Sequence, residues 1–446
     1  MIHISGIVNL EEKILERIKP TVAECKAIRD TAEKLKKKVE KYLKDNKLDV
    51  EVRFVGSVAK GTYLADPDLD LFLLFPSTVS REDLERIGLK TGEDTIGGEK
   101  MYAEHPYTRG LFEGLEVDMV PCFLLESSER LLSAVDRTPF HTEYVLSKIT
   151  DKQRDEIRLL KAFMKGIDAY GAEPNTRGFS GYMCELLVIH FGSFLNVMRA
   201  AAEWKEGVAL AIEKKGPPMT GPLVVYDPVD SKRNVASAVY IDTFATFIVA
   251  CRSYLSNPSE KFFFPLERVP MAETELNGRA EMHGSRLLTV TFKRPDANTD
   301  NIYSQIWKTE YALERKLNAY SFNVLRSVHD LTDKIIIIFE IERDVLSKTF
   351  KHTGPPVWVK SSESFLNKWN NNEYGKPFIE EGQWTVIAER RHNTAEEMLY
   401  EEAALAGIGR EIELETMKIF GHDATLERAP PRLLTELLDP MNPWDI

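Results

Sequence analysis

Residues 56–75 read GSVAKGTYLADPDLDLFLLF, and they contain the strongest chemical signal in this sequence. Ten residues separate Gly56-Ser57 from Asp68-Leu69-Asp70, which leads into an apolar run. Side chains alternate sides along a strand, so Asp68 and Asp70 are expected on one face. Two carboxylates about 4 Å apart repel each other by roughly 1 kcal/mol in water and about 4 kcal/mol at an effective dielectric of 20. We therefore expect a cation between them, and Mg²⁺ suits such oxygen ligands.

A strand and a tight turn are predicted immediately before this pair. Residues 49–55 read DVEVRFV, in which apolar and polar residues alternate up to Gly56-Ser57. The glycine lets backbone N–H groups approach an anion closely, and the Ser57 hydroxyl adds a donor suited to phosphate. Lys60 follows three residues later and adds a positive charge. The turn is therefore a candidate phosphate-binding loop.

A third strand is predicted at residues 115–121, which read LEVDMVP. Its alternation places Glu116 and Asp118 on one face and apolar residues on the other. If this strand pairs beside the first two, Asp118 joins Asp68 and Asp70. Three carboxylates around one or two metal ions are the arrangement that two-metal phosphoryl transfer requires.

Each of these features alone has an ordinary structural explanation, because Gly-Ser turns and Asp-x-Asp strand ends are common in solvated loops. Together, the Gly-Ser turn, the spaced Asp pair and the Asp of a third strand resemble the nucleotidyltransferase superfamily of DNA polymerase beta. Further motifs along essentially the whole chain resemble the archaeal class I CCA-adding enzymes. They are YAEHPY at 102–107, VDMVPC at 117–122, SAVDRTPFH at 133–141, RLLK at 158–161, YGAE at 170–173, RGFSGY at 177–182, DPVD at 227–230 and KRNVA at 232–236.

The resemblance implies an α+β fold in four parts. The parts are a polymerase-beta-like nucleotidyltransferase head (1–142), a helical neck that binds nucleotide and primer end (143–257), an RNA-binding α+β body (258–325 and 395–446), and a tail that contacts the tRNA elbow (326–394). It further implies template-independent addition of C, C and A to the tRNA 3′ end, with CTP and ATP as donors and pyrophosphate as the leaving product. Two Mg²⁺ ions would be held by Asp68, Asp70 and Asp118. The tRNA would be contacted at its acceptor stem and T-arm, and a homodimer is expected.

The resemblance also assigns roles to further side chains. Nucleotide binding is implied for Gly56, Ser57, Lys60, His141, Lys161, Tyr170 and Arg233. His105 and Thr138 are placed near the primer end or the triphosphate. Read from the residues alone, Tyr170 can also be a core tyrosine, and Arg233 can form a structural salt bridge with Asp227 or Asp230.

The neck carries two helical patterns. Arg154, Arg158, Lys161 and Lys165 are spaced by four, three and four residues, which predicts one basic helical face. A solvated face balanced by neighbouring acids is the alternative, and we favour it for Arg154 and Lys165. Residues 178–202 predict one long apolar helix, with Glu185 and His190 as isolated polar positions.

Residues 345–362 form a basic segment that contains Lys348, Lys351 and Lys360, with Phe350 and Trp358 interleaved and no acidic residue. Such a segment suits an RNA phosphate backbone with some stacking on bases. An exposed lysine-rich turn with a core tryptophan explains it equally well. Elsewhere, helices are predicted at 20–46, 81–90 and 309–319, and strands at 286–293 and 334–341.

Composition limits the class of protein. The 446 residues include 58 Lys and Arg against 70 Asp and Glu, a net charge of −12. This charge lowers the expectation of an RNA partner without excluding it, because binding depends on local basic surface. Four widely spaced cysteines predict buried thiols in a reducing cytoplasm, and the lack of an apolar run near 20 residues predicts a soluble protein with no membrane partner. Two alternatives remain: a poly(A)-polymerase-like enzyme, and a non-catalytic RNA-binding protein that keeps the fold.

Overall fold

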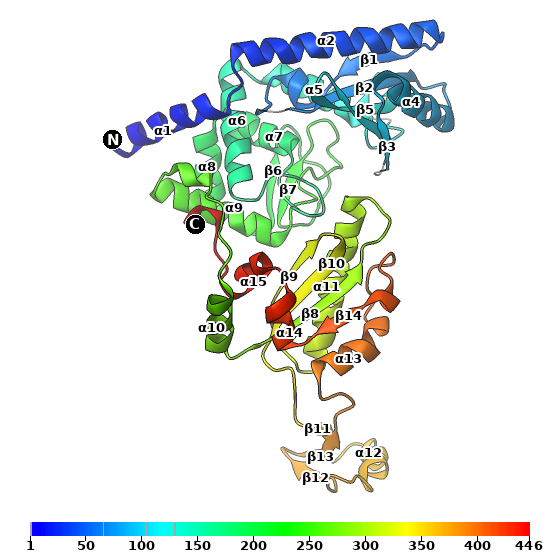
Figure 1. Cartoon of the computed structure of the whole chain (residues 1–446), viewed down its shortest axis with the longest axis vertical. Helices are drawn as coiled ribbons and strands as arrows, with labels where there is room; N and C mark the ends of the chain where they lie inside the picture. The colour runs from blue at the N-terminus through cyan, green and yellow to red at the C-terminus, as the bar shows by residue number, and fades with distance from the viewer. Residues whose placement is uncertain (1, 66, 103–104, 129–130) are drawn as a thin grey trace. The chain divides into compact units, whose positions relative to one another are not determined.

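The predicted carboxylate-bearing strands lie side by side in a five-stranded sheet of order β1-β2-β5-β4-β3 (Figure 1). This computed structural model describes residues 2–65, 67–102, 105–128 and 131–446. β2 pairs antiparallel with β1 and parallel with β5, and β5 and β3 each pair antiparallel with β4. The strands are β1 (Glu51–Phe54), β2 (Leu69–Pro76), β3 (Glu99–Tyr102), β4 (Pro106–Phe112) and β5 (Leu115–Leu124).

Two helices cover one face of this sheet. α2 (Val22–Asp45) begins at a capping box in which Thr21 and Glu24 exchange hydrogen bonds, and α4 (Arg81–Ile96) ends at Gly97 in the left-handed conformation. Their apolar residues share a core with Leu69, Leu71 and the other inward positions of β2 and β5. Both helices were predicted, although α4 is longer than expected. The opposite face of β2 carries Asp70, because side chains alternate along the strand.

The helical part that follows has a largely aromatic and aliphatic core. Phe163, Phe247 and Tyr254 are fully buried there and meet edge to face. The helices are α1 (Ile2–Ile18), α5 (Arg137–Lys148), α6 (Asp151–Gly166), α7 (Gly181–Phe191), α8 (Phe194–Ala202) and α9 (Ile241–Ser256), with the parallel strands β6 (Val208–Ala211) and β7 (Leu223–Tyr226) and a 3₁₀ turn at Glu260–Phe262.

The single apolar helix predicted for residues 178–202 is wrong. The segment forms α7 and α8, which are bent by 91° to each other. Gly192 ends α7 with a φ of +89°, and the Ser193 side chain caps α8 by accepting from the Asn196 N–H. Among the described residues, no single helix is long and apolar enough to span a membrane, whereas this bent pair together is, by length and composition alone. Most residues of both helices are buried in the protein core.

Residues 268–441 form a second compact unit, whereas residues 442–446 belong to the first unit with 1–267. The second unit contains a four-stranded sheet of order β14-β8-β10-β9. The elements are α10 (Glu273–His283), β8 (Arg286–Lys293), α11 (Thr299–Ala319), β9 (Val324–Leu331), β10 (Lys334–Ile341), α13 (Ala395–Glu402), β14 (Lys418–Phe420), α14 (His422–Arg428) and α15 (Pro431–Leu438), and 3₁₀ turns lie at Ala403–Leu405 and Leu414–Thr416. Mixed helix and strand content confirms the α+β class.

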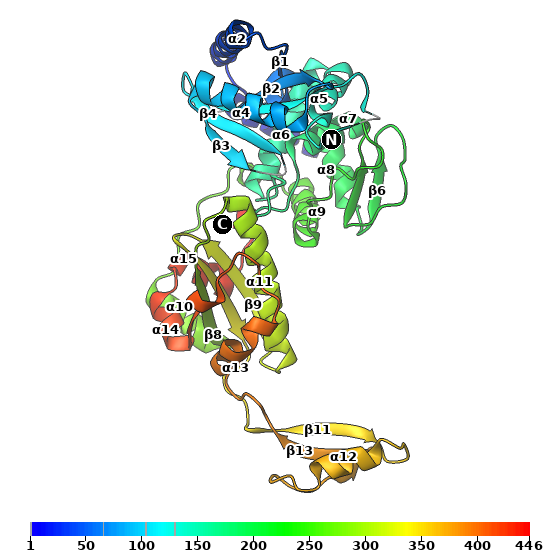
Figure 2. The same cartoon turned by 90° about the vertical axis from the view of Figure 1, so that its right-hand side faces the viewer.

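The segment predicted as a tail has two different structural contexts. β9 and β10 lie inside 326–394 for all but two residues, yet they pair with each other, and β10 pairs with β8. A separate three-stranded sheet has the order β11-β13-β12 and packs with a helix (Figure 2). Its elements are β11 (Thr349–Pro356), α12 (Ser362–Trp369), β12 (Phe378–Glu380) and β13 (Gln383–Glu389). Alternation in β9 is weak, so this strand was hard to recognise from the sequence.

The middle of the basic segment 345–362 forms β11 of this small sheet. Trp358 is 76% exposed, so the alternative that placed it in a core is wrong. Lys348, Lys351 and Lys360 are exposed, and Lys351 pairs with Glu380 of the same sheet at 2.6 Å.

Candidate active site

Three carboxylates come together where β2 begins. The parallel register of β2 and β5 pairs Asp70 with Asp118 across the two strands. Asp68 directly precedes β2, and its charge and that of Asp118 both act on Asp70. The two-residue period of a strand therefore gathers acids that are 48 positions apart in the sequence, from Asp70 to Asp118.

The carboxylates form a site with excess negative charge. Burial, and then the charge of Asp118, raise the pKa of Asp70 to about 7. Burial and the charges of Glu116 and Asp118 raise the pKa of Asp68 as well. Gly56 lies against this group with a φ of +67°, and a Cβ at that position would collide with the Asp70 carboxylate. The donor set, hard oxygens in a shielded and strongly acidic site, fits a divalent cation.

Arg109 is a neighbour of the carboxylates that the sequence did not indicate. It lies opposite Asp118 in the antiparallel β4–β5 pair. Its Nε and Nη2 each donate to a different oxygen of the Asp118 carboxylate, at 2.7 Å. This two-point bond raises the pKa of the guanidinium further above its already high value. Each Asp118 oxygen accepts one of these bonds and keeps a further lone pair, which a metal ion could use.

The predicted phosphate-binding loop forms the short helix α3 (Gly56–Lys60). Ser57 lies in its first turn and is half-buried. Lys60 is almost fully buried, and its Nζ lies 2.5 Å from Glu185 of α7. Lys161 of α6 approaches the same carboxylate at 3.3 Å and donates to the Thr62 carbonyl at 3.2 Å. The structure thus joins two predicted nucleotide-binding lysines through an acid that the sequence left as an isolated polar position.

Burial and neighbouring charges shift the pKa values of Glu185 and Lys161. Burial acts to raise the pKa of Glu185, but the charges of Lys60 and Lys161 hold it below its usual value. Burial lowers the pKa of the Lys161 ammonium, and Glu185 opposes that shift. Thr62 donates its hydroxyl to Glu185 at 2.6 Å, which supports the charged form of the acid. A buried carboxylate with these three donors fixes the loop against α6 and α7.

Most of the basic face of α6 faces the protein: Arg158 and Lys161 are buried and Arg154 is half-buried, whereas Lys165 is exposed, as the solvated alternative predicted for it. Arg154 donates to the Lys60 carbonyl at 3.0 Å, and Arg158 donates to the carbonyls of Tyr63 and Gly61 at 3.0 and 2.6 Å. Arg154 also pairs with Asp151. The solvated-face alternative is therefore incomplete for Arg154. Lys165 lies over the Tyr170 ring, 5.4 Å from its centroid.

Asp227 connects His141 and Arg233, two more of the predicted nucleotide-binding residues. His141 Nε2 lies 2.9 Å from the same Asp227 oxygen that accepts from Arg233 at 3.0 Å. Tyr182 stacks on the His141 ring, with centroids 4.1 Å apart, and donates to Asp227 at 3.2 Å. The salt bridge predicted as an alternative for Arg233 is thus present. Arg233 remains 33% exposed, which leaves part of its guanidinium open.

The remaining predicted residues have varied surroundings. Tyr170 is half-buried, and burial raises the pKa of its hydroxyl. His105 is buried, with Nε2 2.8 Å from the Pro121 carbonyl, and Thr138 lies in the first turn of α5. Ala103 and Glu104 of the YAEHPY motif lie outside the described residues. Lys348, Lys351 and Lys360 belong to the second unit, whereas the carboxylates belong to the first.

These carboxylates, on this sheet and beside these lysines, define a nucleotidyltransferase, and comparison with known families agrees. A family model described as "Nucleotidyltransferase domain" matches residues 36–141. Two further models match later segments: "tRNA nucleotidyltransferase, second domain" at 155–264 and "CCA-adding enzyme, C-terminal domain" at 283–420.

Curated relatives identify the family. A CCA-adding enzyme of Methanosarcina acetivorans is 38% identical over 415 residues, which cover 91% of each chain, and one of Thermoplasma volcanium is 35% identical over 90% of each chain. The chain belongs to the archaeal class I CCA-adding enzymes, as its motifs predicted. Enzymes of the nucleotidyltransferase family use divalent metal ions. Among solved structures, the Cid1 poly(U) polymerase matches with a TM-score of 0.45 and 15% identity, over 57% of this chain and 97% of that chain.

Proposed function

We propose that this chain completes the 3′ end of tRNA by adding C, C and A without a template, with CTP and ATP as donors and pyrophosphate as the leaving product. The observation that carries this proposal is the meeting of Asp68, Asp70 and Asp118 on β2 and β5 within a chain that matches CCA-adding relatives over about nine-tenths of its length. The poly(A)-polymerase-like alternative is less specific, because the matched C-terminal family is that of CCA-adding enzymes.

The metal ions proposed for this site are two Mg²⁺, held by Asp68, Asp70 and Asp118. When bound, such ions lower the pKa of the primer 3′-hydroxyl and neutralise charge on the leaving pyrophosphate. Support comes from the acidic oxygen donors and from the raised pKa of Asp70, since a cation there relieves repulsion between the carboxylates. Arg109 balances part of the charge of Asp118.

The chain's own residues position the reactants. We assign nucleotide binding to the Gly56-Ser57 turn, Lys60, His141, Lys161, Tyr170 and Arg233, in agreement with their family motifs. Glu185 and Asp227 hold Lys161, His141 and Arg233 by direct contacts, so that these donors need little reorganisation when nucleotide binds. Phosphoryl transfer leaves the protein little covalent work, so positioning and charge neutralisation supply most of the catalysis. His105 and Thr138 are assigned to the primer end or triphosphate.

The contacts with tRNA are proposed from family membership. The acceptor stem would reach the neck, and the T-arm would meet the second unit, where Lys348, Lys351 and Lys360 are exposed beside the exposed Trp358. A homodimer and a cytoplasmic location complete the proposal.

A nucleotide-by-nucleotide assay tests this function. A tRNA transcript without its CCA end is incubated with the protein, Mg²⁺ and either labelled CTP, labelled ATP or both. We expect two residues added from CTP alone and three, with no further growth, from both. Long products from ATP alone would instead identify a poly(A)-polymerase-like enzyme.

Variants link the activity to the site. Asp118→Asn removes charge stabilisation worth several kcal/mol and is expected to slow pyrophosphate release by roughly 10³-fold while tRNA binding persists. Glu82→Gln, an exposed acid on α4, is the matched control and should keep its rate. No pyrophosphate release by the parent protein would leave a non-catalytic RNA-binding protein as the explanation.

A further inference from the structure

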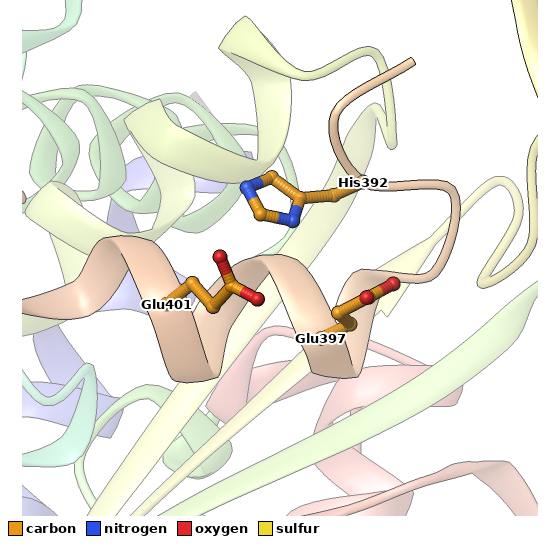
Figure 3. A group of neighbouring side chains, drawn as sticks. All are labelled: His392, Glu397 and Glu401. Atoms are coloured by element: carbon orange, nitrogen blue, oxygen red, sulfur yellow. The ribbon is translucent and has the colours of Figure 1, made fainter. Parts of the chain in front are cut away.

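A second group of potential metal ligands lies in the unit 268–441. His392 lies in the segment between β13 and α13, and Glu397 and Glu401 lie on α13. One ligand atom of each side chain lies within 4.8 Å of the other two. Figure 3 shows the imidazole extending over the helix that carries both carboxylates. None of these residues belongs to the nucleotidyltransferase site.

The imidazole of His392 is buried without a hydrogen bond. The residue is 3% exposed, and neither ring nitrogen has a hydrogen-bond partner among the described residues. A Glu402 oxygen lies 3.8 Å from Nε2, which is too distant for a hydrogen bond. Leaving a buried polar group unsatisfied costs about 1–3 kcal/mol, and most such groups in folded proteins have a partner. The imidazole therefore has nitrogens that no described side chain uses.

The two glutamates are poorly compensated. They are four residues apart on one face of α13, where like charges destabilise a helix. The nearby cations are used by Glu402 instead: Lys316 contacts it at 2.9 Å and Arg391 at 2.6 Å. Arg391 reaches Glu401 only at 3.9 Å. Both Glu397 and Glu401 are exposed, so their side chains can adjust toward a cation.

We propose that His392, Glu397 and Glu401 bind one divalent transition-metal ion of the Zn²⁺ type. One imidazole nitrogen and two carboxylate oxygens form a ligand set that Zn²⁺ accepts, with water in the fourth position. Mg²⁺ prefers oxygen ligands alone, which distinguishes this site from the one at Asp70. The bound ion ties the segment that follows β13 to α13, so its role is to stabilise the second unit. This site does not depend on the proposed activity.

Zn²⁺ binding to the full chain tests the proposal. Asp70→Asn and Asp118→Asn are introduced first to disable the nucleotidyltransferase site, and isothermal titration with Zn²⁺ is done in excess Mg²⁺. We expect one Zn²⁺ per chain. Glu401→Gln and His392→Gln should each weaken it by at least about tenfold, because even the loss of a residue that supports a ligand typically has that effect. Glu396→Gln, an exposed neighbour on α13, is the matched control and should bind as before.

Hydrogen exchange provides the second measurement. Zn²⁺ should slow exchange of the amides in 390–402 in the parent background and not in Glu401→Gln. Because Glu401 is exposed, this substitution leaves the packed core unchanged. The proposal is overturned if Zn²⁺ does not bind in excess Mg²⁺. It is equally overturned if Glu401→Gln binds Zn²⁺ and protects 390–402 like the parent.

Discussion

Asp227 shows how a single buried charge organises the side chains around it. Its side chain is fully buried, and it accepts hydrogen bonds from His141, Tyr182 and Arg233. Burial alone would raise the pKa of Asp227, but the hydrogen bond from His141, together with the Val229 N–H and Arg233, lowers it to about 2. The ionised carboxylate is therefore the form that the folded protein stabilises.

This pKa predicts how Asp227 contributes to stability. Because the folded-state pKa lies below the unfolded value near 3.9, the contribution is present above pH 4 and is lost as the pH falls through about 2. Asp227→Asn should lower the free energy of unfolding by about 2 kcal/mol at pH 7. Urea unfolding should show this difference at pH 5.5 and much less of it at pH 2.5. A difference that does not change with pH would contradict the assignment. Asp230→Asn, a half-buried neighbour paired with Arg137 at 3.3 Å, is the control and should cost less.

At the scale of residues, the sequence predicts those contacts that follow from the alternation of side chains along a strand. Asp70 and Asp118 meet because side chains alternate along two strands whose apolar runs are visible in the sequence. Arg109 was visible only as one polar position in a weak strand. The partners of Lys60 and His141 could not be predicted, because Glu185 and Asp227 lie 125 and 86 positions away in the sequence. Such contacts depend on how helices pack and not on the local pattern.

At the scale of elements, α3, α6 and α7 act as one assembly. Arg158 and Lys161 of α6 donate to backbone carbonyls of the loop after α3. Glu185 of α7 accepts a hydrogen bond from Lys60, the last residue of α3. The four-three-four spacing predicted a basic face of α6. It did not indicate that this face contacts the loop after α3. The break between α7 and α8 was missed because the composition stays apolar across it, and Gly192-Ser193 is a weak signal within such a run.

Glu185 is the acid on which this assembly depends. Glu185→Gln leaves two buried ammonium groups with reduced compensation, and we expect a loss of about 3–5 kcal/mol in the free energy of unfolding. Adding Lys60→Met to this variant should recover part of the loss, because replacing both members of a buried pair is far less costly than removing one. Urea unfolding of the two single variants and the double variant measures the coupling. Glu203→Gln, exposed at the end of α8, serves as control. A stable Glu185→Gln variant would show that the lysines find other partners.

At the scale of the whole molecule, the chain leaves the first unit at Glu267 and re-enters it at Asn442. The family resemblance placed a boundary at residue 258, and nothing in the pattern of residues 442–446 indicates this return. Trp444 explains the return. It is 6% exposed and stacks on Phe262, with ring centroids 5.5 Å apart, while Phe262 stacks on Phe163. Lys261 also donates to the Ile446 carbonyl at 2.7 Å.

Trp444→Ala should therefore destabilise the first unit, although the residue follows the second unit in the sequence. Truncating a buried tryptophan costs about 3–5 kcal/mol through lost burial and the cavity left behind. Hydrogen exchange read by mass spectrometry should speed up in α6 and α9, which share the core with Trp444, and remain unchanged in β8 and β10. Trp358→Ala removes a tryptophan that is 76% exposed and should leave α6, α9, β8 and β10 unaffected. Faster exchange in β8 and β10 of Trp444→Ala would instead mean that the two units unfold as one, since the perturbed aromatic stack belongs to the first unit alone.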